Sequence, residues 1–191
     1  MRIVAGRHRG RRLEAPAGLD VRPTSDRARE ALFNILEHGR FSGDGTSPLL
    51  GAVVLDAFAG SGALGLEALS RGARQLTCME TSAAARSAVR ANAKALGDAG
   101  RVTVLQADAT KPPAAAAACD LVFLDPPYRS GLAAAALPAL ASRGWITDGT
   151  ICVVELAADE DLAAPAGFAG ADERRYGKAK LLFLRFARPT P

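Results

Sequence analysis

Residues 53–65 read VVLDAFAGSGALG, and this stretch decides the fold. The apolar run 53–55 predicts a buried strand that ends at Asp56, and the glycines that follow predict a tight loop leading into a helix. Gly60, Gly62 and Gly65 match the spacing GxGxxG, which is typical of the first strand–loop–helix unit of a nucleotide-binding sheet. The stretch therefore predicts an α/β fold with a ligand site at the end of its first strand.

The chain on both sides of this unit alternates between strand and helix patterns. Such alternation indicates βαβ units and a doubly wound, mostly parallel sheet. After residue 172, the apolar run 181–184 follows a charged segment, and we expect an antiparallel pair at the sheet edge. The predicted helices lie near residues 62–71, 82–96 and 130–142, and the predicted strands lie near residues 52–57, 75–80, 102–106, 120–125 and 150–156.

The amino-terminal fifth of the chain holds all of the excess positive charge. The net charge is +4, and residues 1–40 contain nine arginines and five acidic residues, which also sum to +4. Residues 2–4 and 11–13 predict a hairpin, and a helix is expected after residue 25 with Thr24 or Ser25 as its cap. With a loop at 42–48, this pattern divides the chain into an arginine-rich extension, residues 1–41, and a main domain, residues 49–191.

Three acidic residues favour S-adenosylmethionine (SAM) as the cofactor. Asp56 is unfavourable beside a pyrophosphate but favourable beside the ammonium group of an amino acid, and SAM carries an ammonium and no phosphate. Glu80 and Asp108 follow the next two predicted strands, where they can accept hydrogen bonds from ribose hydroxyls and from the adenine amino group. Because ligands of open α/β sheets bind at the carboxyl ends of the strands, these acids predict one site. Asp56 also disfavours the alternative of an NAD-dependent oxidoreductase.

Residues 123–128 read FLDPPY and close the predicted strand that should lie beside the first one. Each proline restricts the residue before it to an extended conformation, so Asp125 and Pro126 are expected to be extended. The exocyclic amino group of a nucleobase becomes a better nucleophile when acceptors hold its hydrogens. The Asp125 carboxylate and the Pro126 carbonyl can do this while Tyr128 stacks on the ring. These residues alone do not distinguish guanine from adenine.

The motif [DNS]PP[YFW] together with DxFxGxG resembles the amino-methyltransferases of nucleic acids. More narrowly, the chain resembles the RsmD family of 16S rRNA guanine-N2 methyltransferases in residues 22–34 (RPTSDRAREALFN), 56–68 (DAFAGSGALGLEA), 125–128 (DPPY) and 176–178 (YGK). The resemblance implies a Rossmann-like class I SAM-dependent methyltransferase sheet. It also implies methyl transfer to the N2 amine of one guanine in 16S rRNA, within the small ribosomal subunit or a late assembly intermediate. Ser82 departs from the family, whose members often carry an acid there.

The motifs and the resemblance together predict three groups of site residues. The catalytic residues are expected to be Asp125, Pro126, Pro127 and Tyr128. The cofactor-binding residues are expected to be Asp56, Phe58, Gly60, Gly62, Glu80, Asp108 and Ala109. The RNA-binding residues are expected to be Arg7, Arg9, Arg11, Arg12, Arg22, Arg27 and Arg29.

Two alternative functions fit parts of the pattern. A DNA adenine-N6 methyltransferase would also use the DPPY motif, but no sizeable segment is left to read a DNA duplex in the major groove. A non-catalytic RNA-binding assembly factor would use the arginine-rich extension, but it would not need Asp125.

Composition excludes several other classes of protein. No apolar run approaches the roughly 20 residues that a membrane-spanning helix needs, and the arginine-rich amino terminus is not typical of a signal peptide. We therefore expect a cytoplasmic protein, and a monomer. Cys78, Cys119 and Cys152 lie in or beside apolar runs, which predicts buried reduced thiols. His8 and His38 have no partner at metal-ligand spacing, so no metal site is expected.

Overall fold

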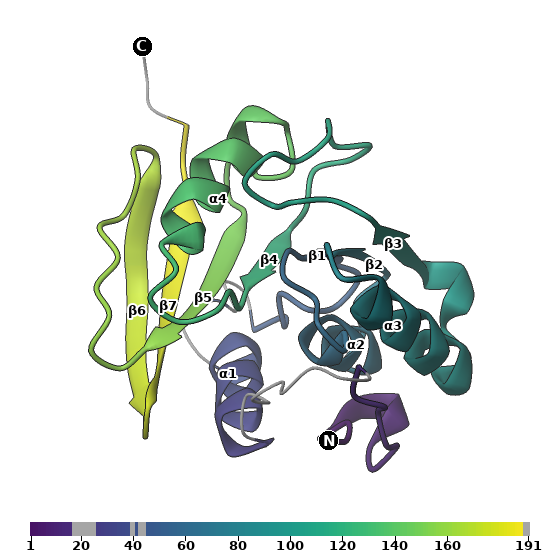
Figure 1. Ribbon diagram of the computed structural model, residues 1–191. Coiled ribbons are helices and arrows are strands. Elements are labelled where there is room, and N and C mark those ends of the chain that lie inside the picture. The colour runs from purple at the N-terminus through teal and green to yellow at the C-terminus, as the bar shows by residue number, and fades with distance from the viewer. Residues whose placement is uncertain (17–25, 39–40, 42–44, 189–191) are drawn as a thin grey trace.

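The fold is described from a computed structural model, which describes residues 1–16, 26–38, 41 and 45–188. The described residues form one seven-stranded sheet in the order β3-β2-β1-β4-β5-β7-β6 (Figure 1). The strands are β1 (Val53–Asp56), β2 (Gln75–Met79), β3 (Val102–Leu105), β4 (Leu121–Leu124), β5 (Ile151–Ala157), β6 (Phe168–Tyr176) and β7 (Ala179–Phe186). The helices are α1 (Asp26–His38), α2 (Ala63–Ser70), α3 (Ala83–Leu96) and α4 (Leu132–Ser142), with short 3-10 turns η1 (Gly6–His8) and η2 (Ala99–Arg101).

The strand pairing confirms the predicted α/β architecture. Strand β1 pairs in parallel with both β2 and β4, so the order of the strands reverses at β1. The glycine loop follows β1 and the DPPY segment follows β4, and the two therefore lie beside each other. Strand β7 is antiparallel to both β5 and β6, which confirms the expected edge pair. No bounds for β6 could be predicted from the sequence, because this exposed edge strand lacks the alternation of apolar and polar residues that marks a half-buried strand.

Two helical layers cover the two faces of the sheet (Figure 1). On one face, Val54, Phe123 and Val153 belong to a buried cluster that includes side chains from α1, α2 and α3. On the other face, Leu55 and Val122 pack with α4. Because neighbouring residues of a strand point to opposite faces, the continuous apolar runs of β1, β4 and β5 fill both layers.

The amino-terminal segment packs against helices α2 and α3. In place of the predicted hairpin strands there is a single antiparallel bridge between Arg2 and Arg12, closed by the 3-10 turn η1. Ile3 and Leu13 are 1% and 5% exposed and lie in the same core cluster as the α1–α3 side chains. Residues 1–13 thus share the core of the main domain, and the division into residues 1–41 and 49–191 stays a prediction from the sequence. The predicted helix caps Thr24 and Ser25 lie outside the described residues.

A buried carboxylate fixes this segment to α2. The backbone N–H groups of Val4 and Ala5 donate hydrogen bonds to the Glu67 carboxylate, at 2.8 and 2.9 Å. Arg71 forms an ion pair with the same carboxylate at 2.8 Å, and Glu67 itself is fully buried. A charge removed from water in this way is tolerable only when it is paired and hydrogen-bonded, so the segment is part of the folded structure.

Candidate functional site

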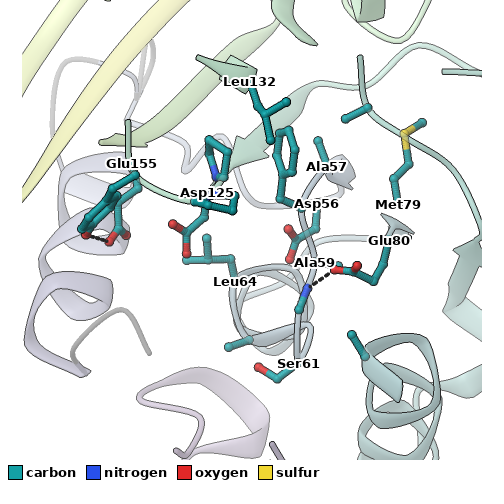
Figure 2. A pocket seen from close by; sticks show the side chains of 18 of the residues that line it. Asp56, Ala57, Ala59, Ser61, Leu64, Met79, Glu80, Asp125, Leu132 and Glu155 are labelled. Atoms are coloured by element: carbon teal, nitrogen blue, oxygen red, sulfur yellow. Dashed lines mark hydrogen bonds between the residues drawn. The ribbon is translucent and has the colours of Figure 1, made fainter. Parts of the chain in front are cut away.

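A cleft of about 1040 Å³ lies at the carboxyl ends of the strands, where ligands of open α/β sheets bind. Five neighbouring strands each bring one acidic residue to its lining. In sheet order from β3 to β5 these residues are Asp108, Glu80, Asp56, Asp125 and Glu155. Figure 2 shows the last four side by side. The cleft therefore joins the glycine loop and the DPPY segment in one site.

Asp56 ends β1 at the bottom of the cleft and is only 1% exposed. Its Oδ2 atom accepts a hydrogen bond of 3.1 Å from the backbone N–H of Gly65, in the first turn of α2. Its Oδ1 atom is buried and has no hydrogen-bond partner among the described residues. Burial raises the pKa of Asp56 to about 7, and nearby Glu80 contributes in the same direction. A cation in the cleft would satisfy this carboxylate.

The glycine loop has two different roles. Gly60 lines the cleft with φ of +53°, and its N–H donates to the Glu80 carboxylate at 3.0 Å, as Figure 2 also shows. Gly62 is not among the residues that line the cleft. It caps α2 in a left-handed conformation, and an added Cβ would lie 3.3 Å from Val89. Gly62 therefore has a conformational role, because a glycine is needed to turn the chain into α2, and its contact with the cofactor stays a prediction.

Glu80 and Asp108 line the same half of the cleft. Glu80 follows β2, and its carboxylate also accepts a hydrogen bond from the Ser82 N–H at 2.8 Å, so it joins the glycine loop to the start of α3. Asp108 lies three residues beyond the end of β3, where its Oδ1 accepts from the N–H and the hydroxyl of Thr110. These hydrogen bonds hold the pKa of Asp108 below its usual value. Phe58 and Ala109, predicted to bind the cofactor, line this half too.

The DPPY segment forms the other half of the cleft. All four of its residues line the cleft. The hydroxyl of Tyr128 donates a hydrogen bond of 2.9 Å to the Oε1 atom of Glu155, which fixes the direction of the ring (Figure 2). Asp125 follows Leu124, which pairs with Val154 of β5, so Asp125 stands level with Glu155 on the neighbouring strand.

Glu155 is a site residue that the sequence did not lead us to predict. It is 4% exposed, lies in β5 and lines the cleft beside Tyr128. The signal was present in the sequence: Glu155 is the one acidic residue in the run 151–157, ICVVELA. A carboxylate in a strand that is buried on both faces needs a polar partner, so it points to a site.

The structure separates the predicted RNA-binding arginines into different groups. Arg29 is 1% exposed, donates to the Arg2 carbonyl at 2.5 Å and lies 3.8 Å from Glu67. It also lines the cleft, and its contact with RNA stays a prediction. Arg7 forms an ion pair with Asp98, and Arg11 donates to the Ala95 carbonyl at 2.7 Å. Both still present exposed surface.

The remaining predicted arginines differ in what the structure describes. Arg9 and Arg12 are exposed on the same segment. Arg22 lies outside the described residues, and so does the side chain of Arg27.

The three cysteines are buried, and burial raises the pKa of Cys119 to about 12 and that of Cys78 well above its usual value. Within the described ranges, no three His, Cys, Asp or Glu side chains are grouped so that they could hold a metal ion. None of the described helices is both long enough and apolar enough to cross a membrane.

Comparison with known proteins identifies relatives along nearly the whole chain. The family model described as Conserved hypothetical protein 95 matches residues 1–185. Ribosomal RNA small subunit methyltransferase D of Escherichia coli K12 is 37% identical over 180 residues, which cover 93% of this chain and 86% of that protein. The Haemophilus influenzae protein of the same name is 33% identical over 181 residues, covering 93% and 89%.

Solved structures agree with this relationship. The yhhF protein of Escherichia coli superimposes with a TM-score of 0.82 at 36% identity and covers 99% of both chains. An RNA methyltransferase from Salinibacter ruber, in complex with S-adenosyl-L-homocysteine, has a TM-score of 0.68 at 16% identity over 88% of this chain and 96% of that one, which is a likeness of fold. With matches of this length and identity, the chain belongs to the Conserved hypothetical protein 95 family, together with the ribosomal RNA small subunit methyltransferases D.

Proposed function

We propose that this protein transfers a methyl group from SAM to the exocyclic N2 amine of a guanine in 16S rRNA. The observation that carries the proposal is the meeting of two motifs in one cleft. The glycine loop after β1 and the DPPY segment after β4 lie on adjacent strands, and both line the cleft. The names of the curated relatives support rRNA as the substrate, and they do not favour a DNA adenine methyltransferase.

The β1–β3 half of the cleft fits SAM. The buried Oδ1 of Asp56 lacks a partner among the described residues, and the ammonium of the methionine end would supply one. Glu80 has a carboxylate beside the loop for the ribose hydroxyls, and Asp108 lies farther along the cleft for the adenine amino group. When bound, SAM supplies a methyl group on a positively charged sulfur, which makes that carbon electrophilic.

The β4–β5 half would hold the target base. The Asp125 carboxylate and the Pro126 carbonyl accept hydrogen bonds from the amine, and this localises the lone pair on nitrogen. On direct transfer of the methyl group to its nitrogen, the amine would become positively charged and would lose one proton, which Asp125 can accept. Tyr128, whose hydroxyl is held by Glu155, gives the base a fixed surface on which to stack. No covalent intermediate with the protein is required.

A direct experiment identifies the modified nucleoside. Small ribosomal subunits from cells lacking the gene would be incubated with the protein and methyl-labelled SAM, and the rRNA would then be digested and analysed by mass spectrometry. We expect labelled N2-methylguanosine at a single position. Labelled N6-methyladenosine, or label in no nucleoside, would contradict the proposal. With such a substrate, we also propose a cytoplasmic location.

We further propose that the amino-terminal segment binds rRNA phosphates through its exposed arginines. Changing Arg9 and Arg12 together to Gln should weaken binding to small subunits and reduce the slope of log affinity against log salt by about two, roughly one for each arginine that no longer neutralises a phosphate. The matched control changes Arg74 and Arg143 to Gln, since both are exposed and lie outside the cleft lining. An equal reduction of the slope in both double variants would show that the segment has no special role.

A further inference from the structure

We infer that Glu155 recognises the Watson–Crick edge of the target base and thereby selects guanine. The inference deepens the proposed methyl transfer and rests on it. It gives a chemical reason for the identity of the target base. The DPPY motif leaves this identity open, because adenine, cytosine and guanine all carry an exocyclic amine.

The position of Glu155 supports this role. Its strand β5 lies next to β4, and neighbouring strands are about 4.8 Å apart. Because Asp125 stands level with Glu155, a planar base whose amine reaches Asp125 brings its adjacent ring atom toward Glu155. In Figure 2 both carboxylates lie on the same side of the cleft, with Glu155 on the side away from Asp56 and Glu80. Glu155 is therefore near the base and distant from the proposed cofactor half.

The donor and acceptor pattern of the bases gives the selectivity. Guanine presents the N1–H and the N2 amine side by side, which are two adjacent donors. An ionised carboxylate only accepts hydrogen bonds, so it can pair with the guanine N1–H. In adenine and cytosine, the ring nitrogen beside the amine is an acceptor and would face the carboxylate lone pairs. At a site that is 4% exposed, such an unmatched pair is costly, because water cannot satisfy either group.

The buried position of Glu155 also has a possible explanation that involves no substrate. Tyr128 donates to its Oε1 atom at 2.9 Å, so a role in positioning the Tyr128 ring is the competing explanation. The two roles separate in the variant Glu155→Gln. Its amide oxygen still accepts from Tyr128, which preserves the positioning contact, while its amide N–H₂ can donate to the ring nitrogen that a carboxylate repels.

The test uses two bases that share the N2 amine but differ at the N1 ring nitrogen and at the group on C6. Small subunits would be reconstituted from rRNA carrying either guanine or 2,6-diaminopurine at the mapped position, since 2,6-diaminopurine has an acceptor in place of the N1–H. For the unchanged protein we expect kcat/KM for guanine to exceed that for 2,6-diaminopurine by about a hundredfold or more. For Glu155→Gln we expect this preference to fall below about threefold, with SAM affinity and melting temperature close to those of the unchanged protein.

The control variant Tyr128→Phe removes the hydrogen bond and keeps the carboxylate. It should lower the rate for both bases and keep the preference for guanine. If Glu155→Gln keeps the full preference, or loses activity equally toward both bases, the inference is wrong and Glu155 only positions Tyr128. If the unchanged protein methylates no guanine in the small subunit, the proposed function fails and the inference fails with it.

Discussion

The β1–β3 half and the β4–β5 half of the cleft hold their acidic side chains in different ways. In the first half, Asp56 and Glu80 accept hydrogen bonds from backbone N–H groups, those of Gly65 in α2 for Asp56 and of Gly60 and Ser82 for Glu80. In the second half, Glu155 is held by the side chain of Tyr128, 27 residues away in the sequence. The first half is thus held by backbone donors, and the second by a side-chain contact that exists only when β4 and β5 are in register.

This difference indicates separate tasks. Fixed backbone donors suit a cofactor that is the same in every reaction cycle. A pair of side chains on neighbouring strands suits a base that must enter and leave the cleft, and whose identity must be checked. Mutations in one half should therefore leave the task of the other half nearly unchanged.

The largest expected effect is on catalysis in the β4–β5 half. Asp125→Ala should reduce the rate of methyl transfer by about a thousandfold or more, because it removes an acceptor that acts mainly on the amine in the transition state. SAM affinity should change by less than about threefold. Single-turnover transfer of labelled methyl and calorimetric titration with SAM measure the two quantities. A large loss of SAM affinity would show that Asp125 belongs to the cofactor half.

A smaller effect with the opposite pattern is expected in the β1–β3 half. Asp56→Asn should weaken SAM binding by about 10- to 100-fold, because this is the usual contribution of a hydrogen bond to a charged group. The same change should stabilise the protein without ligand at pH 8, by up to about 4 kcal/mol, since it removes a buried charge whose pKa is raised to about 7. Calorimetry tests the expected loss of SAM affinity, and thermal unfolding tests the expected gain in stability. A variant that binds SAM normally would contradict the role of Asp56.

The pH dependence sharpens this prediction. Asp56 has a raised pKa, so its contribution to stability is present below the unfolded value of 3.8 and is lost as the pH rises toward about 7. The advantage of Asp56→Asn in unfolding free energy should therefore shrink as the pH falls from 8 to 4. Thermal unfolding of both proteins across this range measures the trend, and a constant difference would argue against a raised pKa.

Cofactor binding should follow the opposite trend. A cation binds the ionised carboxylate, so SAM affinity should rise with pH up to about 7, by as much as tenfold per unit below the pKa, and then level off. Calorimetric titrations in buffers of different ionisation enthalpy should show release of up to one proton at pH 6. Proton uptake, or a flat profile that Asp56→Asn shares, would contradict the assignment.

The two halves also differ in how far the sequence predicted them. The glycine loop, Asp56 and Glu80 could be predicted because each follows a strand directly, and the pattern of apolar runs locates strand ends. Glu155 could not be predicted this way, because its place in the cleft depends on the register between β4 and β5. The same limit applies to Arg29, because its burial depends on the packing of α1 against Glu67, which the sequence alone does not reveal. At Gly62 the spacing motif alone does not distinguish a residue that turns the chain from one that contacts the cofactor.

The central claim is that the cofactor occupies the β1–β3 half and leaves the β4–β5 half open for a base. A crystal structure of the protein with S-adenosylhomocysteine tests this claim directly. We expect the amino group of the ligand within hydrogen-bond distance of Asp56 Oδ1 and its adenosine between Glu80 and Asp108, with Asp125 and Glu155 uncovered. Ligand density over Tyr128 and Glu155, with Asp56 Oδ1 still without a partner, would contradict the claim.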